Sequence, residues 1–108
     1  MVYTIDEIKN IITPIAKKYK LKAVYIFGSY ARGTANESSD IDLLIDTSGT
    51  DIDTLFKLGE LYSELSDVLC KEVDLITVSS LEQPVTRQSE IEFRKTIIKE
   101  RKNLYAVA

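Results

Sequence analysis

Two short stretches, GSYARG at residues 28–33 and SDIDL at residues 39–43, determine how this 108-residue chain is interpreted. The first directly follows an apolar run at residues 23–27, which predicts a buried strand that ends at a glycine turn. The second opens a run in which acidic and apolar side chains alternate. Because alternate side chains of a strand share a face, the carboxylates of Asp40 and Asp42 should point the same way, about 7 Å apart, while the apolar residues face a core.

A glycine turn beside paired acidic residues suits the binding of a phosphorylated ligand. Gly28 has no side chain, so the backbone can approach phosphate groups closely, and Ser29 offers them a hydroxyl and a backbone N–H. Asp40 and Asp42 can hold Mg²⁺ against the phosphates of a nucleotide. The chain contains no histidine, which excludes Ser-His-Asp and Cys-His catalysis and leaves oxygen ligands, and hence Mg²⁺, Mn²⁺ or Ca²⁺, for any metal site.

The remaining sequence alternates between helical and strand periodicity. Thr4 and Glu7 form a capping box before apolar residues at helical spacing, and Pro14 either kinks this helix or restarts it. Further predicted elements are a helical turn at 29–33, a strand at 40–46, a helix at 52–69, a strand at 72–78, a helix at 90–101 and a short strand at 104–107. This order predicts one α+β domain of residues 1–108, a small mixed β-sheet with helices packed against it.

The apolar residues of these elements are expected to form the core. On the strand at 40–46, one face carries Asp40, Asp42, Leu44 and Asp46, and the other carries Ile41, Leu43 and Ile45. On the strand at 72–78, Val73 and Leu75 face one side, and Asp74 and Ile76 face the other. The helical residues expected in the core include Leu55, Phe56, Leu61, Leu65 and Leu69 in one helix, and Ile91, Phe93, Ile97 and Ile98 in the last.

Composition and charge limit the possible partners. Seventeen acidic and 14 basic residues give a net charge of −3, so the surface as a whole attracts neither nucleic acid nor an anionic membrane. Basic clusters at 17–22 and 94–102 are interpreted as solvated helix ends, with partner or RNA contact as the alternative. No apolar segment is long enough to span a membrane, and the first residues lack a signal-peptide pattern. The single cysteine, Cys70, fits a reducing cytoplasm and is expected to be a small packing residue.

The same residues resemble a known family. Gly28-Ser29, ten intervening residues and then Asp40-Ile41-Asp42 is similar to the nucleotidyltransferase pattern of the DNA polymerase β-like superfamily. The two fuller stretches resemble its smallest members, the minimal nucleotidyltransferases found as antitoxins beside HEPN-domain toxins. The resemblance covers nearly the whole chain and implies the nucleotidyltransferase fold, ATP as the substrate and two Mg²⁺ ions.

The resemblance also implies further site residues. The family needs a third carboxylate on a neighbouring strand, and Asp74 is the candidate that would bind metal with Asp40 and Asp42 and activate the acceptor hydroxyl. Arg32 would contact the β- or γ-phosphate as a charge clamp. The structural alternatives are a strand-start cap for Asp40, a solvated strand residue for Asp42 and an exposed strand acid for Asp74. For the other candidates they are an ion pair with an acid such as Glu37 for Arg32, a strand-end residue for Asp46, and packing rather than nucleotide stacking for Tyr30.

Three functions remain open at this stage. The resemblance implies an Mg²⁺-dependent enzyme that moves AMP from ATP to a tyrosine hydroxyl of a cognate HEPN toxin and releases pyrophosphate. Larger relatives carry an added domain for the acceptor, so we expect this chain to take its acceptor surface from another protein. The first alternative is a binding module that neutralises its partner by complex formation. The second is nucleotidyl transfer to RNA or a small molecule, and the acidic net charge argues against RNA.

Overall fold

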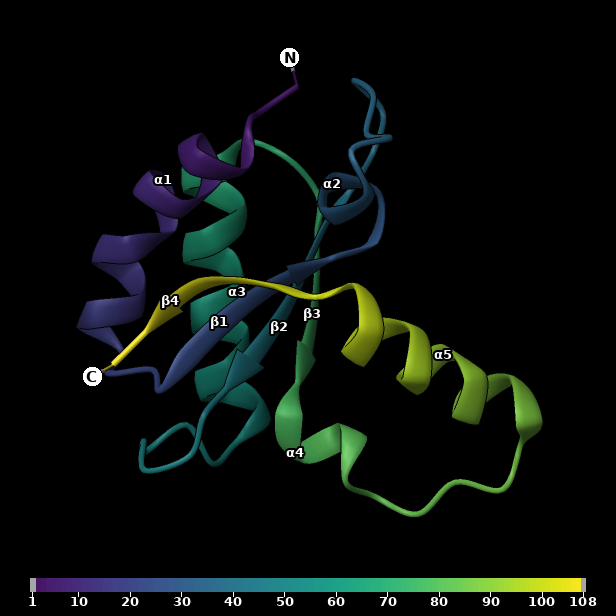
Figure 1. Ribbon diagram of the computed structural model, residues 1–108. Coiled ribbons are helices and arrows are strands. Elements are labelled where there is room, and N and C mark those ends of the chain that lie inside the picture. The colour runs from purple at the N-terminus through teal and green to yellow at the C-terminus, as the bar shows by residue number, and fades with distance from the viewer. Residues whose placement is uncertain (1, 108) are drawn as a thin grey trace.

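The computed structural model describes residues 2–107, in which four strands form one mixed sheet of order β3-β2-β1-β4 (Figure 1). The elements in chain order are α1 (Ile5–Lys18), β1 (Ala23–Phe27), α2 (Gly28–Arg32), β2 (Ile41–Asp46), α3 (Leu55–Leu69), β3 (Val73–Thr77), α4 (Val78–Leu81), α5 (Gln88–Glu100) and β4 (Lys102–Ala106). The predicted α+β class with a small mixed sheet is confirmed, and the end residues of the predicted domain, 1 and 108, lie outside this description. None of the described helices combines the length and the apolar character that a membrane span needs.

The strand β2 lies inside the sheet and determines which residues meet there. It pairs antiparallel with β1 and parallel with β3, so that Asp42 stands opposite Phe27 on one side and opposite Asp74 on the other. β1 also pairs antiparallel with β4. α3 provides the long crossover connection that a parallel pair requires. The strand begins at Ile41, one residue later than predicted, so Asp40 precedes it.

The first helix begins where its capping box predicts. The backbone N–H of Glu7 donates to Thr4 Oγ1 at 3.1 Å, and the backbone N–H of Thr4 donates to Glu7 Oε1 at 2.8 Å. The helix then continues through Pro14 without a second start. Pro14 lies on the exposed side of α1, where water can bind the carbonyl that lacks its backbone donor.

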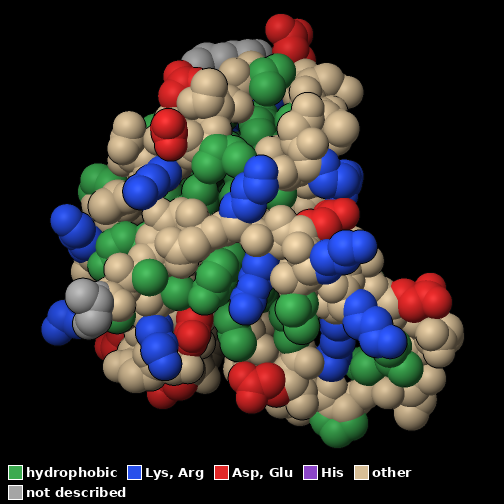
Figure 2. Space-filling model, viewed as in Figure 1, with side chains coloured by type: hydrophobic (Ala, Val, Ile, Leu, Met, Phe, Trp, Pro, Cys, Tyr) green, Lys and Arg blue, Asp and Glu red, His purple; other side chains and the backbone are tan. Residues whose placement is uncertain are grey.

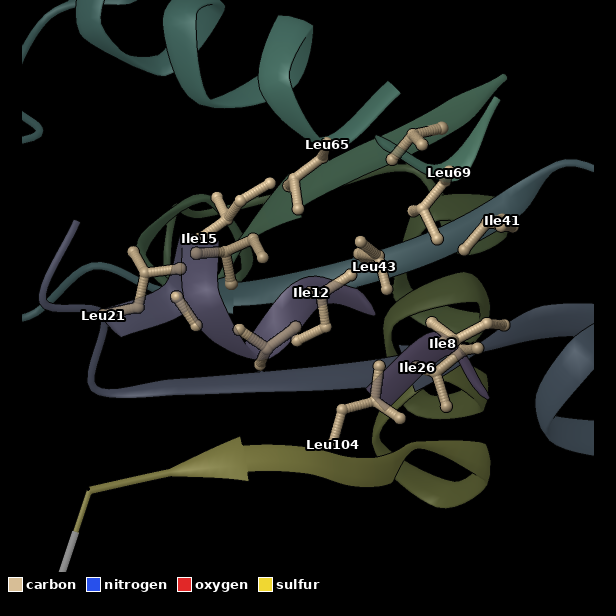
Figure 3. Close-up of a cluster of buried hydrophobic side chains, with 14 of the residues drawn as sticks. Ile8, Ile12, Ile15, Leu21, Ile26, Ile41, Leu43, Leu65, Leu69 and Leu104 are labelled. Atoms are coloured by element: carbon tan, nitrogen blue, oxygen red, sulfur yellow. The ribbon is translucent and has the colours of Figure 1, made fainter. Parts of the chain in front are cut away.

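The main core fills the face of the sheet that α1 and α3 cover (Figure 1). Ile41 and Leu43 of β2 are fully buried there, together with Ile26 of β1 and Leu104 of β4. Figure 3 shows these strand side chains gathered with those of α1 and α3. Burial of such a side chain contributes roughly 1.5–3 kcal/mol, so this layer holds the strands in register. The alternation predicted for β2 is confirmed on its apolar face.

The opposite face of the sheet is covered only in part. Its small apolar cluster consists of Phe27, Leu44 and Ile97. Leu44 is fully buried although it lies on the same face as Asp42, because Ile97 of α5 packs against this cluster. In Figure 1, α5 runs outward from the sheet, and its C-terminal end lies nearest to the strands. The acidic positions on this face therefore stay accessible: Asp42 is half-buried, and Asp74 is exposed.

Several residues predicted as core are exposed in the structure. Leu55 and Phe56 are 87% and 76% exposed, because they form the first turn of α3, ahead of the part of the helix that is buried. Phe93 and Ile98 are 51% and 57% exposed, because α5 buries only one side. Cys70 is exposed as well, at the C-terminal cap of α3, so its predicted packing role is wrong.

Part of the basic cluster at residues 94–102 makes contacts that stabilise the fold. Arg94 donates to the backbone carbonyls of Ser80 at 3.0 Å and Leu81 at 2.8 Å, and to a third carbonyl nearby, so it ties α5 to α4, a short helix that was not predicted. Arg101 stacks over the ring of Tyr25 at 4.4 Å. Figure 2 shows Lys and Arg side chains, in blue, spread over the face formed by β4 and α5. At least two of these cations therefore have structural contacts.

The packing of α5 gives a stability prediction. Ile97→Ala should lower the free energy of unfolding by about 2–4 kcal/mol, because it removes buried methyl groups that hold α5 on the sheet. Ile98→Ala, one residue along and 57% exposed, should change this free energy by less than about 0.5 kcal/mol. Urea unfolding followed by circular dichroism measures both variants. Equal losses would show that α5 does not pack through this side.

Candidate functional site

Two acidic side chains meet on adjacent strands of the sheet. β2 and β3 run parallel and in register, which places Asp42 directly beside Asp74. Their carboxyl groups are close enough to share a hydrogen bond. Asp42 lies inside the sheet, whereas Asp74 lies on the edge strand, open to solvent. The structure therefore brings together the two acids that were predicted on neighbouring strands.

The glycine turn lies against Asp42. Because Phe27 pairs with Asp42 across β1 and β2, the next residue, Gly28, begins α2 beside this carboxylate. Gly28 has a φ of +73°, which side chains other than glycine rarely adopt, and a Cβ here would lie 2.0 Å from Asp42 Oδ2. From the sequence, Gly28 is expected to admit phosphates. The structure adds a second reason for glycine, because a side chain would displace the Asp42 carboxylate.

Asp40 lies apart from this pair. It is exposed in the loop before β2, yet its negative charge acts on Asp42. Within residues 2–107, no group of three or more His, Cys, Asp or Glu side chains is arranged to hold a metal ion. The structure therefore brings two of the three predicted metal ligands into contact and leaves the third nearby.

The electrostatics of the pair suit a cation. Burial, the hydrogen bond with Asp74 and the negative charges of Asp74 and Asp40 raise the pKa of Asp42 from 3.8 to about 6, against the opposing charge of Arg32. A cation beside these groups would relieve the repulsion between the carboxylates. Carboxylate oxygens are also the ligands that Mg²⁺ prefers in proteins. The donors at this site therefore fit Mg²⁺ held against phosphate.

The short helix α2 carries the other two predicted ligand contacts. Ser29 is partly buried beside the turn, and its carbonyl accepts the backbone N–H of Thr34 at 2.9 Å. Arg32 Nη1 donates to Glu100 Oε2 at 3.0 Å, so the ion pair considered as an alternative for Arg32 is present, with a partner on α5. Glu100 was not predicted, because it lies 68 residues away and no local pattern links the two.

Two neighbouring residues have structural contacts. Tyr30 is 4% exposed and packs in the core, as the packing alternative predicts, although its hydroxyl lacks a hydrogen-bond partner among the described residues. Asp46, at the far end of β2, accepts the backbone N–H of Ser48 at 3.0 Å. Partial burial raises the pKa of Asp46, but the hydrogen bonds from Ser48 outweigh it and lower this pKa overall. Asp46 therefore fits the strand-end interpretation.

Comparison with known sequences identifies nucleotidyltransferases as relatives. Residues 9–106 match the family described as polymerase beta, nucleotidyltransferase. A protein of Methanocaldococcus jannaschii, provisionally named a protein adenylyltransferase, is 46% identical over 90 residues, which cover 80% of this chain and 90% of the relative. The protein adenylyltransferase MntA of Thermococcus cleftensis is 35% identical over 88 residues, which cover 78% of this chain and 87% of that protein.

Comparison with solved structures agrees on the fold. A chain in the crystal structure of a toxin–antitoxin with AMP-PNP is similar with a TM-score of 0.69 and 26% identity, over 92% of this chain and 73% of that chain. A chain from the tri-AMPylated Shewanella oneidensis HEPN toxin in complex with MNT antitoxin has a TM-score of 0.65 at 22% identity, over 95% of this chain and 73% of that chain. At that identity the second likeness concerns the fold alone.

The raised pKa of Asp42 predicts a pH-dependent loss of stability. The folded-state pKa of about 6 lies above the ordinary value of 3.8, so the folded protein binds more protons in this window and its stability falls as the pH rises through it. Asp42→Asn should therefore be more stable than the parent protein at about pH 7, by roughly 1 kcal/mol after discounting for solvent screening, with a smaller difference at about pH 4.

Asp46→Asn is the matched control for this measurement. Because the pKa of Asp46 is lowered in the folded state, its ionised carboxylate stabilises the folded protein at pH values above the ordinary pKa of 3.8. This stabilisation is lost as the pH falls below that value. Asp46→Asn should thus be less stable than the parent protein at neutral pH, the opposite sign to Asp42→Asn. Thermal unfolding of the three proteins at both pH values tests this, and the same sign for both variants would contradict it.

Proposed function

The chain belongs to the polymerase β-type nucleotidyltransferase family, and from this we propose that it transfers AMP from ATP, with Mg²⁺, to a tyrosine hydroxyl of a HEPN-type toxin. The modification would neutralise the toxin, so the protein would act as its antitoxin. The observation that carries the proposal is the contact between Asp42 and Asp74 beside Gly28. Paired carboxylates next to a turn without side-chain bulk suit a metal ion and a triphosphate.

The relatives support the finer parts of this proposal. The name of the Thermococcus cleftensis relative gives AMP as the transferred group and a protein as the acceptor. The toxin–antitoxin structure at 26% identity was solved with AMP-PNP, an analogue of ATP, which supports ATP as the substrate. The HEPN class of the partner follows from the resemblance of the glycine turn and the paired acids to minimal nucleotidyltransferases.

In this proposal the metal-binding residues are Asp40, Asp42 and Asp74. When bound, Mg²⁺ neutralises phosphate charge and aligns the α-phosphate for attack. Gly28 leaves room for the triphosphate, and Ser29 donates its hydroxyl and backbone N–H to phosphate oxygens. Asp40 approaches from the loop before β2, where it is free of the strand ladder and can adjust its position.

Arg32 would act on the leaving phosphates, and Asp74 would act on the attacking hydroxyl. Arg32 would contact the β- or γ-phosphate while its ion pair with Glu100 orients the guanidinium. Asp74, exposed on the edge strand, would accept the proton of the tyrosine hydroxyl. The tyrosine oxygen would then bond to the α-phosphorus, the bond from that phosphorus to the bridging oxygen would break, and pyrophosphate would leave.

The loss of Asp42 gives the first test of this function. Asp42→Asn should reduce AMP transfer to the co-expressed protein of the adjacent reading frame by about 100-fold or more, because it removes a charged ligand of the metal. Asp46→Asn, on the same strand and face, should keep nearly full transfer, because Ser48 already binds its carboxylate. Mass spectrometry of the partner detects the added adenylate.

Neutralisation of the partner separates the alternatives. If the double variant Asp40→Ala/Asp42→Ala still neutralises the partner as well as the parent protein does, the chain is a binding module and catalysis is not its function. If labelled ATP marks RNA or a small molecule and leaves the partner unmarked, the acceptor assignment is wrong.

The glycine turn gives a second test. Gly33→Ala should cost about 1 kcal/mol of stability because of its positive φ, and Gly28→Ala should cost more, because its Cβ also clashes with Asp42. Only a Cβ at Gly28 meets Asp42; one at Gly33 meets no atom within 4 Å. Gly28→Ala should therefore lose AMP transfer by about 100-fold, since small displacements of reacting groups have effects of this size, while Gly33→Ala keeps it. Equal activity of the two variants in the mass-spectrometric assay would contradict this role for Gly28.

A further inference from the structure

A groove lies between α3 and the edge strand β3. It has a volume of about 420 Å³, and Leu55 and Tyr62 of α3 line it on one side. Glu72 and Asp74 line it on the other side. The groove therefore runs along the edge strand that carries Asp74, one of the two acids that meet at the candidate site. No other residue of that site lines it.

The helix side of the groove is apolar and exposed. Leu55 and Phe56 are 87% and 76% exposed, and Tyr62, which lies two helical turns after Leu55, is 37% exposed. A second hollow of about 1220 Å³ shares Leu55 and also contains Phe56, so the apolar surface continues around the start of α3. Neither Leu55 nor Phe56 packs in the core, so the fold does not account for them.

The strand side of the groove is acidic and has an open edge. β3 is the first strand of the sheet, so within residues 2–107 only β2 pairs with it. Its outer edge can therefore offer backbone N–H and C=O groups to an incoming chain. Among the described residues, the groove is lined by two acidic residues, Glu72 and Asp74, and by no Lys or Arg. This combination fits a polypeptide segment with apolar and basic side chains.

We propose that this groove is the docking site for the segment of the partner protein that carries the acceptor hydroxyl. The proposal rests on the function proposed above, because it takes Asp74 as the residue that receives the acceptor. A segment against Leu55 and Phe56 would be held by its apolar side chains, and its basic side chains would face Glu72. Its hydroxyl would reach Asp74 from the open edge of β3, while the nucleotide would lie on the side of Asp42 and Gly28.

Continuity with the candidate site favours a partner segment over a second copy of this chain. The acceptor of a nucleotidyl transfer must reach the triphosphate, and the groove leads to Asp74, the exposed member of the carboxylate pair. A second copy seated in the groove would cover Asp74 and obstruct that approach. The occupant we assign is therefore a hydroxyl-bearing, basic and apolar segment of the protein that is modified.

The experiment introduces a charge at the apolar wall. In Leu55→Lys, in the groove, and Phe56→Lys, beside it, a cation replaces an exposed apolar side chain and should repel the basic side chains of the segment. Both residues stand in the exposed first turn of α3, so folding should be kept. We expect the KM for the co-expressed partner protein to rise about tenfold or more, with kcat and the affinity for Mg²⁺-ATP within about twofold of the parent protein. Ile98→Lys, at a 57% exposed isoleucine on α5, is the matched control and should leave all three values unchanged.

The outcomes separate this proposal from the proposed function. If the parent protein transfers AMP and both groove variants keep its KM for the partner, the docking site is wrong and the function stands. If the parent protein transfers no AMP but binds the partner, and only the groove variants lose binding in calorimetry, the docking site stands and the function is wrong. If light scattering shows a dimer of the parent protein that Leu55→Lys dissociates, a second copy covers the groove and the docking proposal is overturned.

Discussion

Two carboxylates, on Asp42 of β2 and Asp74 of β3, are held in contact although both carry negative charge when ionised. Repulsion between them works against folding, and it adds to the burial and the hydrogen bond with Asp74 that raise the pKa of Asp42. The parallel register of β2 and β3 leaves the pair no freedom to separate along the strands. This register is held from the other face, where Ile41 and Leu43 are fully buried under α1 and α3. The core thus holds the two carboxylates together although their repulsion favours separation.

One face of the sheet therefore forms the core, and the other holds the candidate site. One face is closed by two helices and supplies most of the buried apolar surface. On the other face, α5 and α4 cover Leu44 and its neighbours and leave the acids accessible. Gly28 contributes to both, since it ends a core strand and leaves space for the Asp42 carboxylate. A domain that closed both faces equally would bury these acids and leave no room for the nucleotide of the proposed reaction.

Some of the exposed side chains away from the carboxylate pair hold the fold together, and others offer surface for a partner. Arg94 and Arg101 make contacts that hold α5 and β4 in place, so part of the basic cluster is structural. Leu55 and Phe56 are not among the described residues that pack in the core; Leu55 lines the acidic groove at the edge of the sheet, and Phe56 lies beside it. Under the proposed function, the outer edge of β3, which pairs with no other strand within residues 2–107, would offer an acceptor protein backbone groups beside the apolar first turn of α3.

The local patterns of the sequence determined the capping box of Thr4 and Glu7, the alternation along β2, and the placement of Asp42 and Asp74 on the polar face of their strands. These follow from backbone periodicity, which acts over a few residues and leaves its mark in the order of residue types. Only the tertiary structure decided that Arg32 pairs with Glu100, that a side chain at Gly28 would collide with Asp42, and that Leu55 and Phe56 stay outside the core. Such contacts depend on where whole helices and strands come to rest against one another, and residues far apart in the chain leave no shared periodicity by which they could be foreseen.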